Sequence, residues 1–175
     1  MKMRKPFIGG NWKMNLNFQD ALHLGRQLKM NLVPPLASDV AIFPPAIYIN
    51  PLAEILRNSP IAIGGQNVYY EDKGAFTGEL SCEMLSSSGA KLVIVGHSER
   101  RHIFGESNEI INLKLSKALS SGLIPVFCVG EKLDERKAKK TFDVINEQLM
   151  KGLAGLNLTD PAKIIIAYLH IYVNK

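Results

Sequence analysis

The amino-acid sequence predicts an α/β protein whose strands form a parallel sheet. Short apolar runs alternate six times with segments of helical periodicity, roughly 20 to 40 residues apart, which is typical of successive βα units. The run Leu92 to Val95 is apolar throughout and leads directly into Gly96, as expected for a strand buried on both faces. Strands buried in this way belong to parallel sheets covered by helices.

The expected strands are apolar runs that end at glycine, proline or a polar residue. They cover residues 6–10, 39–43, 61–63, 92–95, 124–129 and 163–168. Pro44 and Pro45 end the second strand, because proline has no N–H to donate to a central ladder. A long polar loop is expected over 64–78, before a short helix at 80–85.

The expected helices carry apolar residues at helical spacing. Asn17 is expected to cap the first helix, and Ser107 to cap a helix that ends at Gly122. Another helix follows the second strand and carries Leu52, Ile55 and Leu56. The last expected helix is long and amphipathic and ends at Gly152; its apolar residues are Ala138, Phe142, Ile145 and Leu149.

The composition is ordinary for a globular protein, with 46% hydrophobic and 21% charged residues and a net charge of +5. The one basic cluster, 136–140, lies in a helical pattern, which favours a solvated helix face over a nucleic-acid surface. Cys82 and Cys128 lack the spacing of a metal or redox site. No apolar stretch approaches the roughly 20 residues that span a bilayer. We therefore expect a cytoplasmic protein that binds neither nucleic acid nor membrane.

Periodicity alone leaves two architectures open: a doubly wound open sheet, or part of a closed barrel of βα units. The first expected strand is not followed by G-x-G-x-x-G, and the sequence contains no G-x-x-x-x-G-K-[ST] phosphate loop. These absences weaken the nucleotide-binding versions of the open sheet.

Four polar blocks stand at the ends of expected strands or in the loops that follow them. They are GNWKMN at 10–15, GAFTGE at 74–79, GHSERR at 96–101 and CVGE at 128–131. In α/β folds this end of the strands carries the chemistry, because loops and helix N-termini meet there. Taken together, in this order and over 5–168, the blocks resemble those of the triosephosphate isomerases.

The resemblance implies an incomplete (β/α)8 TIM barrel, in which residues 1–175 would form one domain with about six of the eight βα units. It also implies the interconversion of dihydroxyacetone phosphate and glyceraldehyde 3-phosphate, a step of glycolysis and gluconeogenesis. A proton moves between adjacent carbons through an enediolate, without a metal ion or organic cofactor. Such chemistry needs a carboxylate base, an electrophile for the carbonyl oxygen and positive charge for the phosphate.

The resemblance also assigns roles to four residues. Lys13 would be the active-site cation and Asn11 a neighbouring hydrogen-bond donor that orients it, with a turn residue as the less favoured alternative for Asn11. His97 would be the electrophile and would act as a neutral imidazole. This family is a standard example of a neutral histidine in that role. Glu99 would accompany His97 and pair with Lys13, with a purely structural ion pair as the alternative. Burial and Lys13 should lower the pKa of His97, whereas Glu99 should raise it.

The loop 66–79 resembles an arm that family members insert into a partner subunit. Thr77 would lie near Asn11 and Lys13 of the partner subunit, and Phe76 at the tip would be covered there. The resemblance therefore implies a homodimer, with a solvent-exposed excursion of the loop as the alternative.

The sequence departs from the family after Tyr168. The family has its catalytic glutamate directly after Ala-Tyr, where this chain has Leu169. A lid, two strands and phosphate-binding loops would follow in the family, and 170–175 do not match them. We therefore expect an open barrel with the first and sixth strands as edges, and a chain that is inactive alone. His170 is a poor substitute for the base, because on an extended chain it points to the opposite side.

Functions from two different classes remain open at this point. The first is an isomerase by descent with a partly preserved active site. The second is a non-catalytic fragment or interaction protein that keeps about three quarters of the fold. A different α/β protein with an open sheet is a distant third, distinguished by whether the first and sixth strands lie near each other.

Overall fold

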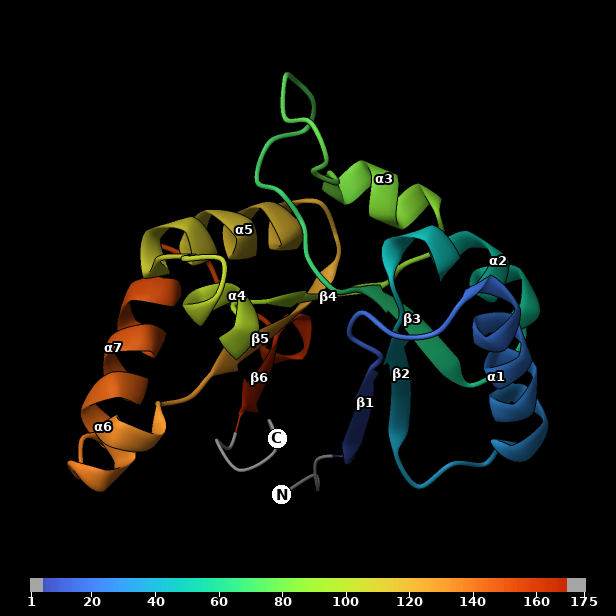
Figure 1. Cartoon of the computed structure of the whole chain (residues 1–175), viewed down its shortest axis with the longest axis horizontal. Helices are drawn as coiled ribbons and strands as arrows, with labels where there is room; N and C mark the ends of the chain where they lie inside the picture. The colour runs from blue at the N-terminus through green and yellow to red at the C-terminus, as the bar shows by residue number, and fades with distance from the viewer. Residues whose placement is uncertain (1–4, 170–175) are drawn as a thin grey trace.

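The structure, a computed structural model, describes residues 5–169. Six strands form one parallel sheet in the order of the sequence (Figure 1). They are β1 (Phe7–Asn11), β2 (Asp39–Phe43), β3 (Ile61–Gly65), β4 (Leu92–Val95), β5 (Ile124–Val129) and β6 (Ile165–Tyr168). Each strand pairs in parallel with the next one along the chain. The predicted parallel sheet is therefore confirmed, with strand ends that differ by one or two residues.

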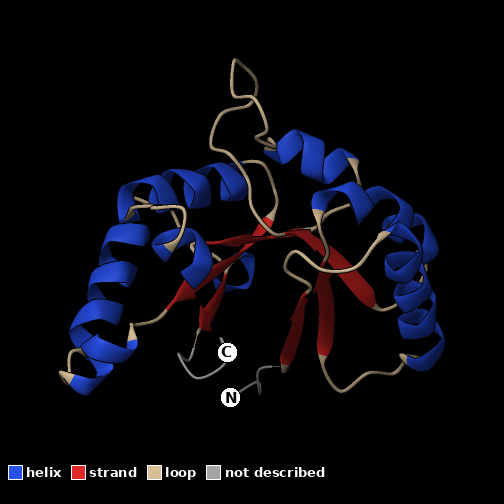
Figure 2. Ribbon diagram, viewed as in Figure 1, coloured by secondary structure: helices blue, strands red, loops and turns tan. Residues whose placement is uncertain are grey.

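The sheet is curled into a half-barrel, and the helices lie along its outer side (Figure 2). A doubly wound sheet reverses its strand order partway across, which this sheet does not do. The structure thus confirms the incomplete barrel, and the open-sheet alternative is wrong. Within the described residues, β1 and β6 are the two edges of the sheet.

The helices follow the strands in alternation. They are α1 (Phe18–Asn31), α2 (Ile49–Ile55), α3 (Cys82–Ser87), α4 (Ser98–His102), α5 (Asn108–Ser120), α6 (Leu133–Lys137) and α7 (Thr141–Gly152), with short 3₁₀ turns at Ala46–Tyr48 and Pro161–Lys163. The side chain of Asn17 accepts a hydrogen bond from the Asp20 amide (3.0 Å), and that of Ser107 accepts one from the Ile110 amide (3.3 Å). Both predicted caps are confirmed. None of the helices within 5–169 is long and apolar enough to cross a membrane.

The prediction of one long helix before the last strand is wrong, because the segment is split into α6 and α7. Lys139 has φ 59°, a left-handed conformation that cannot continue a right-handed helix. The break reorients the chain, so that Phe142 is 86% exposed instead of lying on an apolar face. Ile145 and Leu149 do pack against the core, as expected.

The core has two layers, one on each face of the curled sheet. The outer layer lies between the strands and the helices and contains large buried side chains such as Phe127, Ile111 and Leu115. The inner layer lies on the concave face, and its buried members are Ala41, Phe43, Leu92, Ile94, Val126 and Cys128. Alternate residues of each strand supply the two layers, which explains why the central strands are apolar throughout.

Candidate active site

The predicted site residues Asn11, Lys13, His97 and Glu99 converge at the carboxyl ends of β1 and β4. Asn11 is the last residue of β1, and His97 follows β4 by two residues. Asn11 and His97 line an inner cavity of about 350 Å³, together with apolar side chains of the concave face. His97 is buried, with 8% of its surface exposed. Asn11 and His97 supply the polar side chains among the described residues that line this cavity.

The backbone of Lys13 adopts a left-handed conformation, with φ 53°. This conformation costs a residue with a side chain about 1–2 kcal/mol, so other contacts must hold it. The Asn11 side-chain oxygen accepts a hydrogen bond from the Lys13 amide at 2.9 Å. The Gln66 side-chain nitrogen donates to the Lys13 carbonyl and to the Phe43 carbonyl, both at 2.8 Å. Asn11 and Gln66 therefore fix Lys13 from both sides of its Cα atom.

Lys13 and Glu99 form an ion pair across the site, with 2.9 Å between Nζ and Oε1. Their side chains are 38% and 36% exposed, so the pair is open to solvent and contributes little to stability. The predicted pairing of these two residues is confirmed. Its effect is positional, because it directs the Lys13 ammonium group from the end of β1 toward the start of α4.

The imidazole of His97 is held by the first turn of α4. Its Nδ1 accepts a hydrogen bond from the Glu99 amide at 3.3 Å, which favours a neutral ring that carries its proton on Nε2. Burial lowers the pKa of His97; Glu99, whose Oε2 lies 3.3 Å from Nδ1, opposes this shift, and Lys13 reinforces it. These directions agree with the prediction. The ring can therefore present a neutral N–H to a ligand at neutral pH.

Arg101 joins the ends of β4 and β5 beside His97. Its guanidinium group donates to the Gly96 carbonyl (2.8 Å), the Cys128 carbonyl (3.1 Å) and the Asn108 side chain (2.7 Å). Arginine suits this position because its planar group presents several donors in a fixed geometry. Sequence reasoning missed the roles of Arg101 and Gln66. Arg101 lies within the GHSERR block, whereas nothing in the sequence distinguishes Gln66 beyond its place after β3.

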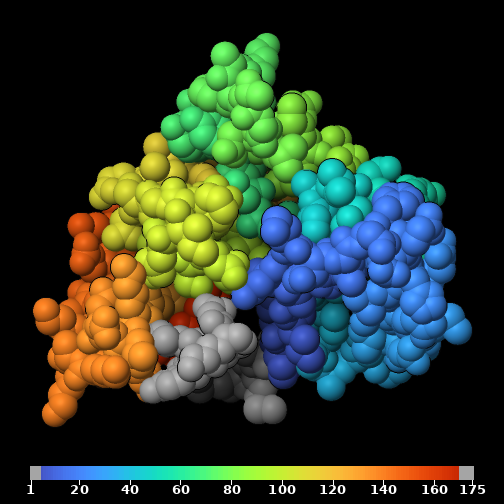
Figure 3. Space-filling model, in the orientation of Figure 1, coloured from blue at the N-terminus to red at the C-terminus, as the bar shows by residue number. Residues whose placement is uncertain are grey.

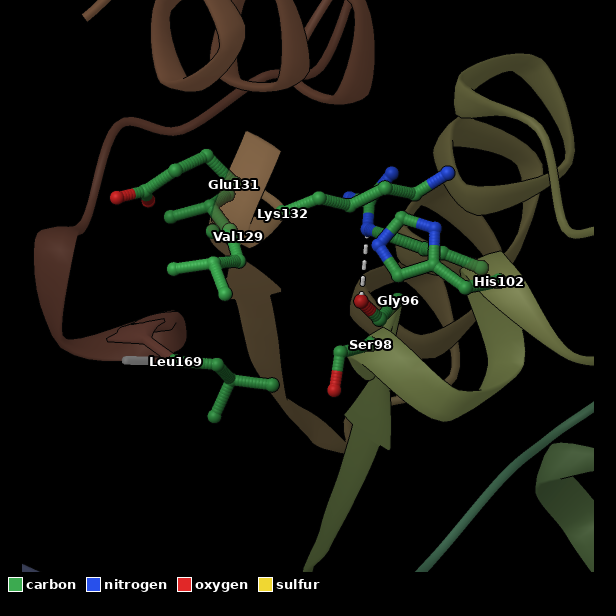
Figure 4. Close-up of a pocket in the computed structure, with 10 residues that line it drawn as sticks. Gly96, Ser98, His102, Val129, Glu131, Lys132 and Leu169 are labelled. Carbon is green, nitrogen blue, oxygen red and sulfur yellow. Dashed lines mark hydrogen bonds between the residues drawn. The ribbon is translucent and has the colours of Figure 1, made fainter. Parts of the chain in front are cut away.

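Leu169 continues β6 and occupies the position at which the resemblance expects a base. Its amide donates to the Val129 carbonyl at 2.8 Å, so the backbone extends the β5–β6 ladder by one residue. Leu169 lines the inner cavity and a second cavity of about 260 Å³ beside it. Figure 4 shows this second cavity, with the side chains of Leu169, Ser98 and Val129 around it. His170, the other residue considered for this role, lies outside the described residues.

A buried carboxylate anchors the end of β6 from outside the barrel. Glu131 accepts hydrogen bonds from the Tyr168 hydroxyl (3.0 Å), the Thr141 hydroxyl (3.1 Å) and Arg136 (3.0 Å). Burial alone would raise the pKa of Glu131, but these donors and its own backbone N–H outweigh burial and lower the pKa. The ionised group thus fixes Tyr168, and with it the backbone that leads to Leu169.

The loop between β3 and α3 stands out from the rest of the chain as an arm (Figure 3). Lys117 of α5 holds it through an ion pair with Asp72 at 2.6 Å. Phe76 packs against the ring of Tyr69, with 4.6 Å between centroids, and is 39% exposed, while Thr77 is exposed. Phe76 is thus covered in part by its own arm, and the predicted contact of Phe76 and Thr77 with a partner subunit stays a prediction.

The chain consists of parallel βα units wound in sequence order, and its polar site residues gather at the carboxyl ends of the strands. These two features define it as a TIM-barrel protein. The sequence pattern of one family, described as triosephosphate isomerase, matches residues 6–169. The chain belongs to this family.

Curated relatives named triosephosphate isomerase are similar over nearly the whole chain. The relative from Carboxydothermus hydrogenoformans is 48% identical over 166 residues, and the one from Syntrophotalea carbinolica is 42% identical over the same number. The relative from Thermoanaerobacter pseudethanolicus is 40% identical over 166 residues. Each match covers 95% of this chain and 66% of the relative, so the chain spans just under two thirds of the length of these proteins.

Proposed function

We propose that this chain supplies the cation and the electrophile of a triose-phosphate isomerase site, which interconverts dihydroxyacetone phosphate and glyceraldehyde 3-phosphate. The observation that carries the proposal is the buried His97, whose Nδ1 is occupied by the Glu99 amide and whose lowered pKa favours the neutral ring. Such a ring donates a hydrogen bond to a substrate carbonyl without needing a charge.

The proposed chemistry moves a proton between adjacent carbons of the triose. As the proton leaves carbon, negative charge develops on the carbonyl oxygen, and the Nε2–H of His97 donates to this oxygen. The ammonium group of Lys13 attracts the same charge and the phosphate dianion. Asn11 acts on the backbone of Lys13, which places the ammonium group in the site. Glu99 orients Lys13 through their ion pair.

This chemistry also needs a proton acceptor. Among residues 5–169, no proton-accepting side chain stands at the position where the family has its catalytic base. Leu169 stands there, and its hydrocarbon side chain cannot accept a proton. A positioned general base contributes roughly 10²–10⁴-fold to the rate of such a step. We therefore propose that the 175-residue chain by itself turns over triose phosphates at a low rate. The same observation favours a second candidate, a non-catalytic interaction protein.

We extend the proposal to a cytoplasmic homodimer that contacts its partner through the arm. Two exposed apolar side chains support this contact: Met14, one residue from Lys13, is 95% exposed, and Phe76 in the arm is 39% exposed. Large apolar side chains that face solvent in this way would be covered by the contact with a partner subunit.

The test is an isomerase assay on the purified chain and on two variants. We expect a low rate for the unaltered chain, and only a small gain for Leu169→Glu, because a base without a closed site around it is poorly positioned. Lys13→Ala, assayed in parallel, measures contamination by the host's own isomerase. A rate in the unaltered chain typical of family enzymes, abolished in Lys13→Ala, would contradict the proposed inactivity and exclude the interaction protein.

A further inference from the structure

The proposed chemistry leaves a buried ionic cluster without a function. The cluster consists of Arg100 of α4, Glu106, which precedes α5, and Lys114 of α5. Lys114 and Glu106 are buried, with 3% and 9% of their surfaces exposed. The Lys114 ammonium group donates to the Glu106 carboxylate at 2.6 Å, and the Arg100 guanidinium group donates to the same carboxylate oxygen. Charged groups from α4, from α5 and from the turn between them therefore meet at one oxygen atom.

Stability alone does not explain such a cluster. Removing an ammonium group from water is costly, and burial lowers the pKa of Lys114 accordingly, an effect that Glu106 opposes. Apolar side chains of similar volume often stabilise a protein as well as a buried ion pair does. What the ionic groups add is a fixed geometry, because each hydrogen bond has a preferred length and direction. The parts of the chain that the cluster holds in place therefore indicate its role.

One of these parts is the segment that leaves β3. The Lys114 ammonium group donates a second hydrogen bond, to the Asn67 side-chain oxygen at 2.8 Å. Asn67 directly follows Gln66. The Gln66 side-chain nitrogen donates to the carbonyls of Lys13 and Phe43, both at 2.8 Å. Helix α5 therefore fixes the residue next to the one that holds the backbone of Lys13.

The other part is the helix α4. The Arg100 carbonyl accepts a hydrogen bond from the Glu106 amide at 3.0 Å, in addition to the side-chain bond between these two residues. The residue before Arg100 is Glu99, which forms the ion pair with Lys13 at 2.9 Å. The cluster thus holds both supports of Lys13 in place, Gln66 after β3 and Glu99 in α4.

Lys13 should respond to small movements of these supports. Its left-handed backbone, with φ 53°, is strained and persists only while the contacts around it are kept. The hydrogen bond from Gln66 weakens as its length and angle depart from the ideal. Val68 is fully buried and keeps this segment attached to the core. Loss of the Asn67 contact should therefore shift Gln66 without unfolding the protein.

We propose that Lys114 and Asn67 are positioning residues for Lys13: through Gln66, they place the Lys13 ammonium group where it attracts the phosphate dianion of the substrate. They act on the backbone that carries Lys13 and not on the substrate itself. The inference rests on the proposed function, which assigns this role to Lys13.

Three variants test the contact between α5 and Asn67. Asn67→Leu removes the acceptor at similar volume and leaves the ion pair of Lys114 and Glu106 intact, whereas Asn67→Asp keeps an acceptor in the same place. Asn112→Leu is the matched control. Asn112 also lies on α5, but its side chain donates to the carbonyls of Gly152 (2.8 Å) and Ala154 (2.9 Å) and so joins α5 to the end of α7.

The first measurement is the ¹³C chemical shifts of Cα and Cβ of Lys13, which report its backbone conformation. Asn67→Leu should move them away from left-handed values. Asn67→Asp and Asn112→Leu should leave them unchanged, although Asn112→Leu should also lower the free energy of unfolding in urea. Lys114→Met repeats the test should Asn67→Leu fail to fold. Unmoved Lys13 shifts in the folded variant would overturn the proposal.

A double variant tests the route through Gln66. Gln66→Met and Asn67→Leu both act on the same hydrogen bond to the Lys13 carbonyl. The double variant should therefore displace the Lys13 shifts no further than Gln66→Met does alone. Displacements that add would show that Asn67 acts on Lys13 by another route, and would contradict the proposed one.

Affinity for dihydroxyacetone phosphate is measured separately, by calorimetry. Asn67→Leu should weaken binding about three- to tenfold, because a displaced ammonium group loses part of a charge-assisted contact, and Asn67→Asp should restore it. Binding that weakens in Lys13→Ala but not in Asn67→Leu would overturn the positioning role. Displaced Lys13 shifts, with binding unchanged in both variants, would support the effect of Asn67 on Lys13 and contradict the proposed function. The two inferences can therefore fail independently.

Discussion

The role of Gln66 provides a quantitative prediction. Gln66→Met removes two hydrogen bonds, to the carbonyls of Lys13 and Phe43, at nearly constant side-chain length. Each such bond contributes a net 0.5–1.5 kcal/mol, so their loss should lower the free energy of unfolding by about 1–3 kcal/mol. Once released, Lys13 can leave its left-handed conformation (φ 53°) and recover about 1–2 kcal/mol. The observed loss should then be much smaller, on the order of 0.5 kcal/mol, with Lys13 displaced.

A Lys13→Gly background separates the two effects. Glycine adopts the left-handed conformation without strain, so no strain energy is recovered there, and Gln66→Met should show its full loss of about 1–3 kcal/mol. Urea unfolding of the unaltered chain, of Gln66→Met, of Lys13→Gly and of the double variant measures this difference. The matched control is Gln148→Met, because Gln148 also makes two hydrogen bonds, to the amide and carbonyl of Gly130 at 2.9 Å, but lies far along the chain from Lys13. An equal loss in both backgrounds, with the Lys13 resonances unmoved, would refute the account of Gln66.

Three further predictions concern other parts of the chain. Folding lowers the pKa of His97 from 6.5, so its contribution to the free energy of unfolding should be complete above pH 6.5 and should be lost as the pH falls through the folded-state pKa. The free energy of unfolding should therefore be lower at pH 5 than at pH 7.5, and His97→Gln should reduce this difference. Thr77→Arg should sediment as a smaller species than the unaltered chain. If the variant and the unaltered chain both sediment as the same monomer at high concentration, the proposed interface is contradicted. Lys139→Gly should raise the free energy of unfolding by about 0.5–1 kcal/mol and Lys139→Ala should not, since only glycine relieves the φ of 59°.

Much of the fold could be predicted because local signals and burial agree. The strands are apolar runs such as Leu92–Val95, buried on both faces, and the caps at Asn17 and Ser107 act within a few residues of themselves. The break between α6 and α7 could not be predicted, because the left-handed residue there is a lysine and not a glycine. The exposure of Phe142 follows from that break, so this error has the same origin.

The candidate site was predictable only in part, for a different reason. Lys13, His97 and Glu99 belong to sequence blocks that resemble a known family. The ion pair between Lys13 and Glu99 forms as expected. Gln66 acts by bridging the carbonyls of Phe43 and Lys13, and this proximity arises only when β1, β2 and β3 are side by side. Contacts made by tertiary pairing leave no local pattern in the sequence. Arg101 is an intermediate case, since its block was noted but its bonds to two strand ends were not.

The most direct test of the central claim is ¹⁵N NMR of His97 at pH 7, with and without dihydroxyacetone phosphate. The unaltered chain should show a neutral ring with the proton on Nε2, since Nδ1 accepts the Glu99 amide. Saturating substrate should shift the Nε2 resonance, and Lys13→Met should abolish this shift. An imidazolium ring, a proton on Nδ1, or an Nε2 resonance that does not respond to the substrate would contradict the assignment of His97 as the electrophile.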